Sequence, residues 1–121
     1  MTGLKIFTIE PMGKPRMTRA DSWKKRPCIQ KYWDYKKQLN LQRNGFVMPE
    51  SGYHVRFEIP MPSSWSKKKK AQMDGKPHQS TPDKDNLEKA LLDALETNDA
   101  HIWDGRVTKL WGYEGKIVIR W

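Results

Sequence analysis

The sequence predicts a small single-domain α/β protein in which a mixed β-sheet packs against two main helices. Three observations lead to this fold class. The chain has 121 residues and is 36% hydrophobic, which suits one compact domain with a real core. Segments with the two-residue period of strands alternate with segments of helical period. Glycine and proline separate these segments without a linker long enough to divide the chain, so we expect one domain over residues 1–121.

The first half of the chain predicts two strands with a loop and a helix between them. Residues 4–9 alternate between apolar and polar side chains, as in a strand. Residues 11–27 form a basic loop, because proline and glycine prevent a helix. Residues 29–44 predict a helix that Gly45 terminates. Residues 52–61 alternate again and predict a half-buried strand.

The second half predicts a short helix, a long helix and two closing strands. Ser64 or Ser66 could start the short helix, which carries four consecutive lysines. Residues 85–96 give the strongest helical pattern in the chain, with a stripe of leucines on one face. Residues 106–113 and 116–121 predict strands joined by a turn, which completes a mixed sheet.

Charge is unevenly distributed along the chain, whose net charge is +9. Residues 1–82 contain 17 Lys/Arg and 6 Asp/Glu, a net +11. Residues 83–104 contain 2 Lys/Arg and 7 Asp/Glu, a net −5. Residues 105–121 contain 4 Lys/Arg and 1 Asp/Glu, a net +3. A basic protein with one acidic region suggests a polyanionic partner, with nucleic acid the first candidate.

Two carboxylates lie at the start of the helix predicted over residues 85–96. Asp83 precedes it, Asp85 is in its first turn, and Lys89 follows four residues later on the same face, opposite the leucine stripe. Mg²⁺ binds carboxylate oxygens together with water and substrate phosphates, and phosphodiester-cleaving sites often hold two such ions. Asp104, directly before a predicted strand, is the candidate for a further acid.

A simpler interpretation of these acids is structural. Asp85 followed by Glu88 fits a capping box, and Asp85 with Lys89 fits an ordinary surface ion pair. That interpretation leaves Asp83 and the surrounding positive charge unexplained. A nuclease accounts for both, because its acids must lie in a basic cleft to meet DNA, where Lys89 would offset charge in the transition state. The competing class is a non-catalytic basic DNA-binding module.

The segment "PDKDNLEKALLDAL" followed by "IWDGRV" resembles the RusA family of Holliday junction resolvases of phages and prophages. The resemblance extends over nearly the whole chain, from the early strand and basic loop to the two closing strands. Asn86 and Asp93 match the motif as supporting residues. Residues 103–107 depart from it, because they hold one acid where the family often has two in tandem, and Arg106 replaces glutamine.

The resemblance implies an Mg²⁺-dependent endonuclease, with Mn²⁺ able to substitute, that cuts four-way DNA junctions by paired nicks in recombination and repair. Asp83, Asp85 and Asp104 would be its metal-binding catalytic acids, and Lys89 its essential lysine. It also implies a homodimer, because two symmetric nicks need two active sites related by a two-fold axis. A nuclease for other branched or single-stranded DNA is the alternative within this fold.

Basic residues of the loop and of the lysine-rich segment are expected to contact DNA phosphates. In an ordinary protein such a lysine run is only a solvated surface, but here it accompanies the acidic motif. Trp23 or Trp65 could stack on a base, although most tryptophans are expected in the core. The expected DNA-binding residues are Lys14, Arg16, Arg19, Lys67, Lys68, Lys69, Lys70 and Lys76.

Several classes of protein are excluded by what the sequence lacks. No apolar run approaches the roughly 20 residues of a membrane span, and the N-terminus lacks a signal-peptide pattern. Cys28 is the one cysteine, which excludes an intrachain disulfide. We expect a cytoplasmic protein of a bacterial host, encoded by a phage or prophage, without a membrane partner or small-molecule cofactor. His78 and His101 are expected on the surface. Leu91, Leu92 and Leu95 are expected in the core, although an exposed Leu92 could contribute to a dimer interface.

Overall fold

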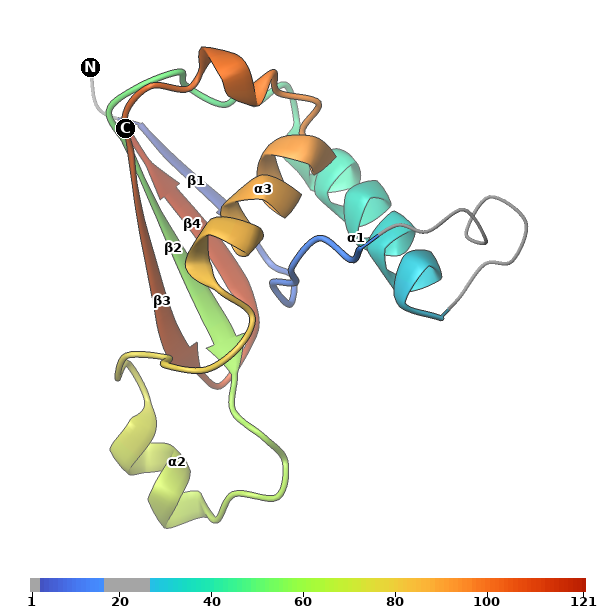
Figure 1. Ribbon diagram of the computed structural model, residues 1–121. Helices are drawn as coiled ribbons and strands as arrows, with labels where there is room; N and C mark the ends of the chain where they lie inside the picture. The colour runs from blue at the N-terminus through green and yellow to red at the C-terminus, as the bar shows by residue number, and fades with distance from the viewer. Residues whose placement is uncertain (1–2, 17–26) are drawn as a thin grey trace.

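The computed structural model describes residues 3–16 and 27–121, which form an α/β domain around a four-stranded sheet (Figure 1). Arg19 and Trp23 therefore lie outside the described residues. The ends of the helices and strands differ from the predicted ones by at most two residues. In chain order the elements are β1 (Leu4–Phe7), α1 (Pro27–Arg43), β2 (Tyr53–Pro60), α2 (Lys67–Met73), α3 (Lys84–Ala94), the 3-10 helix η2 (Asp99–His101), β3 (Gly105–Gly112) and β4 (Lys116–Arg120).

The sheet is mixed, as the sequence predicts, with strand order β1-β4-β2-β3. β4 is antiparallel to both β1 and β2, whereas β2 and β3 run parallel. A parallel pair needs a long crossover connection, and the chain from β2 through α2 and α3 to β3 provides it. β3 and β4 follow each other in the sequence but do not pair, because β2 lies between them. The crossover brings the starts of β2 and β3 to the same end of the sheet.

One face of the sheet forms the core with α1 and α3 (Figure 1). Alternate residues of β2 and β4 point to this face, and Val55, Phe57, Ile117 and Ile119 have no solvent exposure. Burial of each such side chain stabilises the fold by roughly 1.5–3 kcal/mol. The leucine stripe of α3 packs against them, as its helical spacing predicts.

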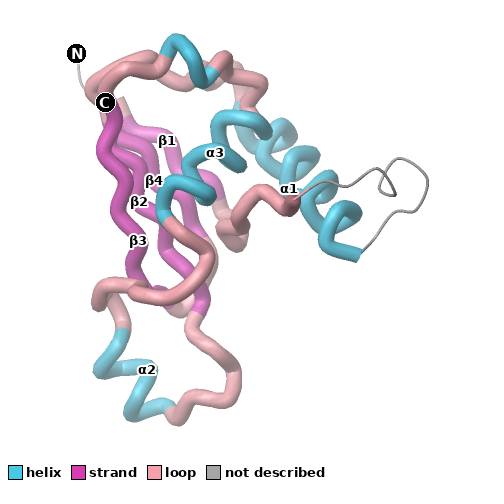
Figure 2. Tube along the Cα trace, viewed as in Figure 1, coloured by secondary structure: helices cyan, strands magenta, loops and turns pink. Residues whose placement is uncertain are grey.

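The lysine-rich segment forms an extension beyond the ends of β2 and β3 (Figure 2); residues 64–78 are here called the lysine arm. Ser66 caps α2, because its hydroxyl oxygen accepts a hydrogen bond from the Lys69 backbone N–H at 3.1 Å. The rings of Trp65 and His78 lie 4.8 and 4.3 Å from that of Trp111 in β3. The arm is thus anchored to β3 by aromatic packing.

One prediction of surface exposure is wrong. His78 is only 5% exposed, because it packs against Trp111 at the base of the lysine arm. Its Nδ1 has no hydrogen-bond partner, and burial together with the charge of Lys109 lowers its pKa. The prediction that Leu92 lies in the core is confirmed: it is 4% exposed, since α3 is covered by both the sheet and α1. It therefore offers no apolar surface to a second subunit.

Candidate active site

The start of α3 places two of the predicted acids on the surface. Asp83 is the N-cap residue but its side chain makes no capping hydrogen bond, and Asp85 follows in the first turn. The capping-box interpretation of Asp85 is therefore wrong, because Asp83 occupies the cap position. The Lys109 ammonium group of β3 donates to the carbonyl oxygens of Ser80 and Pro82 at 2.6 and 2.9 Å. β3 thus fixes the path of the chain into α3.

Asp104 lies directly before β3, at the end of the sheet where β2 also begins. The backbone N–H of Gly52 donates to the Asp104 carbonyl oxygen at 3.1 Å. One residue earlier, the Trp103 N–H donates to the Glu50 carbonyl oxygen at 3.2 Å. The backbone before β3 is therefore held in place, whereas the Asp104 side chain is exposed.

A tyrosine and a glutamate that the sequence did not mark as site residues connect α3 with the start of β2, which pairs with the start of β3. The Tyr53 hydroxyl donates to the Glu88 carboxylate at 2.5 Å, and Glu88 lies three residues after Asp85. Burial, this hydrogen bond and the charges of Glu88 and Asp104 raise the pKa of Tyr53, so its hydroxyl keeps the proton. A Cβ at Gly105 would lie 2.3 Å from the Tyr53 ring, which explains glycine there.

The three predicted metal-binding acids share one property. Asp83, Asp85 and Asp104 are exposed, and none has a hydrogen bond or ion pair from its side chain to another described residue. Within the described ranges, no group of three or more His, Cys, Asp or Glu side chains is arranged to hold a metal ion. The acids are therefore not a preformed three-ligand cluster. Their donor chemistry does fit Mg²⁺, which takes one or two carboxylates and completes its shell with water and substrate phosphates.

Lys89 lines a hollow beside α3 together with Lys14. Its expected ion pair with Asp85 is absent among the described contacts, and its side chain is exposed. Lys14 comes from the loop after β1, which passes close to α3. A Cβ at Gly13 would lie 2.3 Å from the Asn86 amide nitrogen, so this loop crosses the first turn of the helix. The fold therefore places two amines on the surface of α3.

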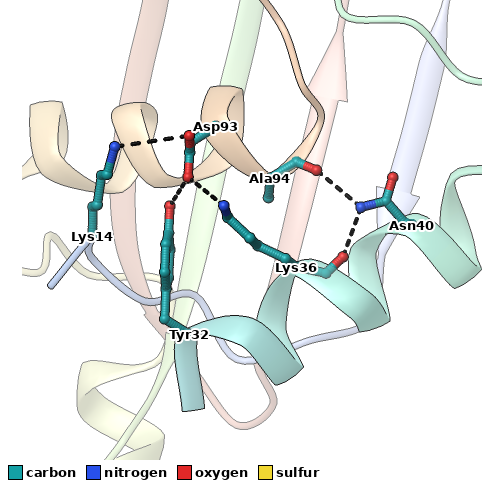
Figure 3. Close-up of polar contacts among 6 residues, drawn as sticks. All are labelled: Lys14, Tyr32, Lys36, Asn40, Asp93 and Ala94. Atoms are coloured by element: carbon teal, nitrogen blue, oxygen red, sulfur yellow. Dashed lines mark hydrogen bonds and ion pairs between the residues drawn. The ribbon is translucent and has the colours of Figure 1, made fainter. Parts of the chain in front are cut away.

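Asp93, one turn after Lys89, has several partners (Figure 3). The Tyr32 hydroxyl donates to it at 2.6 Å, the Lys36 ammonium lies 2.8 Å away, and that of Lys14 lies 3.8 Å away. Burial opposes ionisation of Asp93, but the hydrogen bonds and the two lysine charges prevail and lower its pKa. The Asn40 side chain adds a bond to the Ala94 carbonyl oxygen at 3.0 Å. These contacts join α1, α3 and the basic loop.

Most predicted DNA-binding residues lie on the surface. Lys14 and Arg16 are exposed in the loop after β1, and Arg19 lies outside the described residues. The lysines of the arm are exposed except the partly covered Lys70. The Lys69 ammonium lies 4.2 Å from the centroid of the Trp65 ring, which fits a cation–π contact. Trp65 therefore packs within the arm.

The comparisons with known proteins agree with the acidic motif. A family model described as Endodeoxyribonuclease RusA matches residues 8–120. The chain belongs to the RusA family. It is accordingly a crossover junction endodeoxyribonuclease, which confirms the resemblance inferred from the sequence. A search of curated proteins found no match. In the described part of this RusA-family chain, no helix combines the length and apolarity that a membrane crossing requires.

Proposed function

We propose that this RusA-family chain resolves four-way DNA junctions as an Mg²⁺-dependent homodimer that makes paired nicks. The observation that carries the proposal is a set of three exposed acids without basic partners among the described residues, in a chain of net charge +9. Such carboxylates alone would repel DNA. They serve a nuclease when a divalent ion joins them to a substrate phosphate.

Each group has a distinct task in this proposal. Asp83, Asp85 and Asp104 would hold the divalent ion, which would supply positive charge to phosphoryl oxygens and lower the pKa of a water molecule. Lys89 offsets the negative charge that grows on the phosphate in the transition state. Lys14 and the lysine arm bind neighbouring phosphates, and this positions the bond to be cut.

The homodimer follows from the reaction rather than from a particular surface. Resolution of a junction requires one cut in each of two symmetry-related strands, and each protomer carries one set of acids. A two-fold axis between protomers therefore matches the symmetry of the substrate. Mn²⁺ accepts the same oxygen ligands and would replace Mg²⁺ in this site.

A labelled synthetic four-way junction tests the proposal, with linear duplex, single-stranded DNA and a three-way branch as competing substrates. We expect Mg²⁺-dependent paired nicks on the four-way junction and no cutting by Asp85→Asn. Asp34→Asn, which removes an exposed acid from α1, is the matched control and should cut at the normal rate. Equal cutting of the three-way branch would favour the alternative of a broader branched-DNA nuclease. A failure to cut with any divalent ion would overturn the proposal.

A further inference from the structure

The sheet face opposite α1 and α3 carries a row of basic side chains. The strand registers place Arg106 of β3, His54 of β2 and Arg120 of β4 side by side across three strands. Their positions alternate with those of the buried core residues, so they point to the other face. Leu4 and Ile6 of β1 lie on the same face and are 56% and 49% exposed. No helix of the described residues contributes core contacts there.

The two outer arginines of this basic row lack protein partners among the described residues. Arg106 and Arg120 are exposed, and their side chains make no hydrogen bond or ion pair to another described residue. Arg56, two residues along β2, forms an ion pair with Glu58 at 3.2 Å. The row itself contains no acid, so its positive charge is not neutralised within the described chain.

His54 lies among the positively charged side chains of this face. Burial and the charges of Arg106, Arg56 and Arg120 lower the pKa of its imidazole. The Thr108 hydroxyl of β3 lies 2.8 Å from the His54 Nε2. No acid of β2, β3 or β4 is positioned to counter the three guanidinium groups around it, apart from Glu58, which faces Arg56.

Like charges on neighbouring strands destabilise a sheet, so this arrangement lowers the stability of the isolated protein. An anionic partner would remove the penalty. A second copy of the chain is a poor partner, because a two-fold axis through this face would set one basic row against another. A phosphate backbone has the required charge and repeat, and guanidinium groups bind phosphate with two parallel hydrogen bonds.

We infer that the row of Arg106, His54 and Arg120 binds the phosphate backbone of a duplex DNA arm. This contact deepens the proposed function, on which it rests, because it lies on the opposite side of the sheet from α3. One protomer would then hold two duplex arms, one at the acids and one at the basic row. Linear duplex can occupy either surface, whereas a junction can engage both.

Binding of Arg106→Gln/Arg120→Gln to a four-way junction tests this inference. We expect at least about a tenfold loss of affinity, because two charge-assisted contacts to phosphate are removed. The slope of log affinity against log salt should fall by about 0.9 for each arginine. Lys31→Gln/Lys37→Gln, which removes two exposed charges from α1, is the matched control and should lose much less affinity.

The thermal midpoint of the arginine variant should equal or exceed that of the unmodified protein, since repulsion between the two arginines is relieved.

A second measurement uses the unmodified protein and so does not depend on how a variant folds. The His54 imidazole resonance, assigned with His54→Gln, is titrated against pH with and without saturating duplex DNA. Bound phosphate should raise the His54 pKa. An unchanged pKa, or an arginine variant that binds like its control, would overturn the inference. A variant that changed only the oligomeric state would also overturn it, in favour of a protein interface. Both measurements report binding, so they remain decisive even if junction cleavage fails.

Discussion

Asp93 and the pair Asp83 and Asp85 lie on the same helix, but their surroundings are opposite. Asp93 accepts a hydrogen bond from Tyr32 and is within ion-pair distance of Lys36 and Lys14. Asp83 and Asp85 are two to three turns away and have no such partner among the described residues. Their environment differs although the chain carries 23 Lys/Arg residues that could have paired with them.

The difference separates acids that hold the fold together from acids that are kept available. The partners of Asp93 come from α1 and the loop after β1, so its ionised form joins three segments. The unpaired acids contribute little to folding, because exposed carboxylates without partners gain no compensating contact. Their availability is what a divalent ion and a substrate phosphate require.

The largest expected effect is the loss of cleavage in Asp83→Asn and in Asp104→Asn. Each should reduce the rate of junction cutting by at least about 10²–10³-fold, the usual result of removing a group that stabilises the transition state. Junction affinity should persist, because removal of negative charge does not weaken binding to a polyanion. Gel-shift titration beside single-turnover cleavage measures both quantities. Normal cleavage by either variant would remove that residue from the site.

Asp93→Asn should instead act on stability. The free energy of unfolding is expected to fall by about 1–2 kcal/mol, since the ion pairs are lost while partial exposure limits their strength. Urea denaturation measures this change, and cleavage per folded molecule should stay within a few fold of normal. An unaltered urea midpoint together with abolished cleavage would show that Asp93 does not stabilise the fold and would place it among the reacting groups.

Tyr53→Phe tests the connection between α3 and the start of β2. Loss of the hydroxyl removes one hydrogen bond to Glu88, and stability should fall by about 1 kcal/mol. Glu88→Gln keeps an acceptor for that hydroxyl and serves as the matched variant, with a smaller change in the urea midpoint. If Glu88→Gln abolished cleavage as Asp85→Asn is expected to, Glu88 would count as a fourth acid of the site.

The smallest expected effect is a dependence of stability on pH between about 7 and 5. The pKa values of His54 and His78 are lowered below the ordinary 6.5, so the unfolded chain binds more protons in this range. The free energy of unfolding should therefore decrease as pH falls through 6.5. The pKa of Asp93 lies below the ordinary 3.8, so protonation of this carboxylate lowers the stability only in more acidic solution than this range. Urea midpoints at several pH values measure the trend, which His54→Gln should weaken; a rise in stability toward pH 5 would contradict it.

The fold class and most helix and strand positions could be predicted from the sequence because they depend on local periodicity. The leucine stripe of α3 and the alternation in β2 illustrate this. The position of β4 between β1 and β2 could not, since strand pairing depends on long-range contacts. His78 was misplaced for the same reason: its burial comes from Trp111, which lies in a distant strand.

The candidate site was predictable only in part. Spacing on one helix predicted Asp83, Asp85 and Lys89 as site residues, and Asp104 was predicted from its position before a strand and from the family motif. The contact of Tyr53 with Glu88 joins residues 35 apart in the sequence, and that of Tyr32 with Asp93 joins residues 61 apart. Neither pair leaves a periodic signal, so only the folded structure reveals which acids are paired and which are free.

The most direct test is a comparison of Asp85→Asn and Asp93→Asn on the same four-way junction with saturating Mg²⁺, with cleavage rates expressed per folded molecule. Both variants remove one carboxylate from α3 and replace it with the same amide. The account predicts that Asp85→Asn abolishes paired nicking without loss of stability, whereas Asp93→Asn nicks at close to the normal rate despite its lower stability. Equal rates for the two variants would contradict the division between paired and available acids.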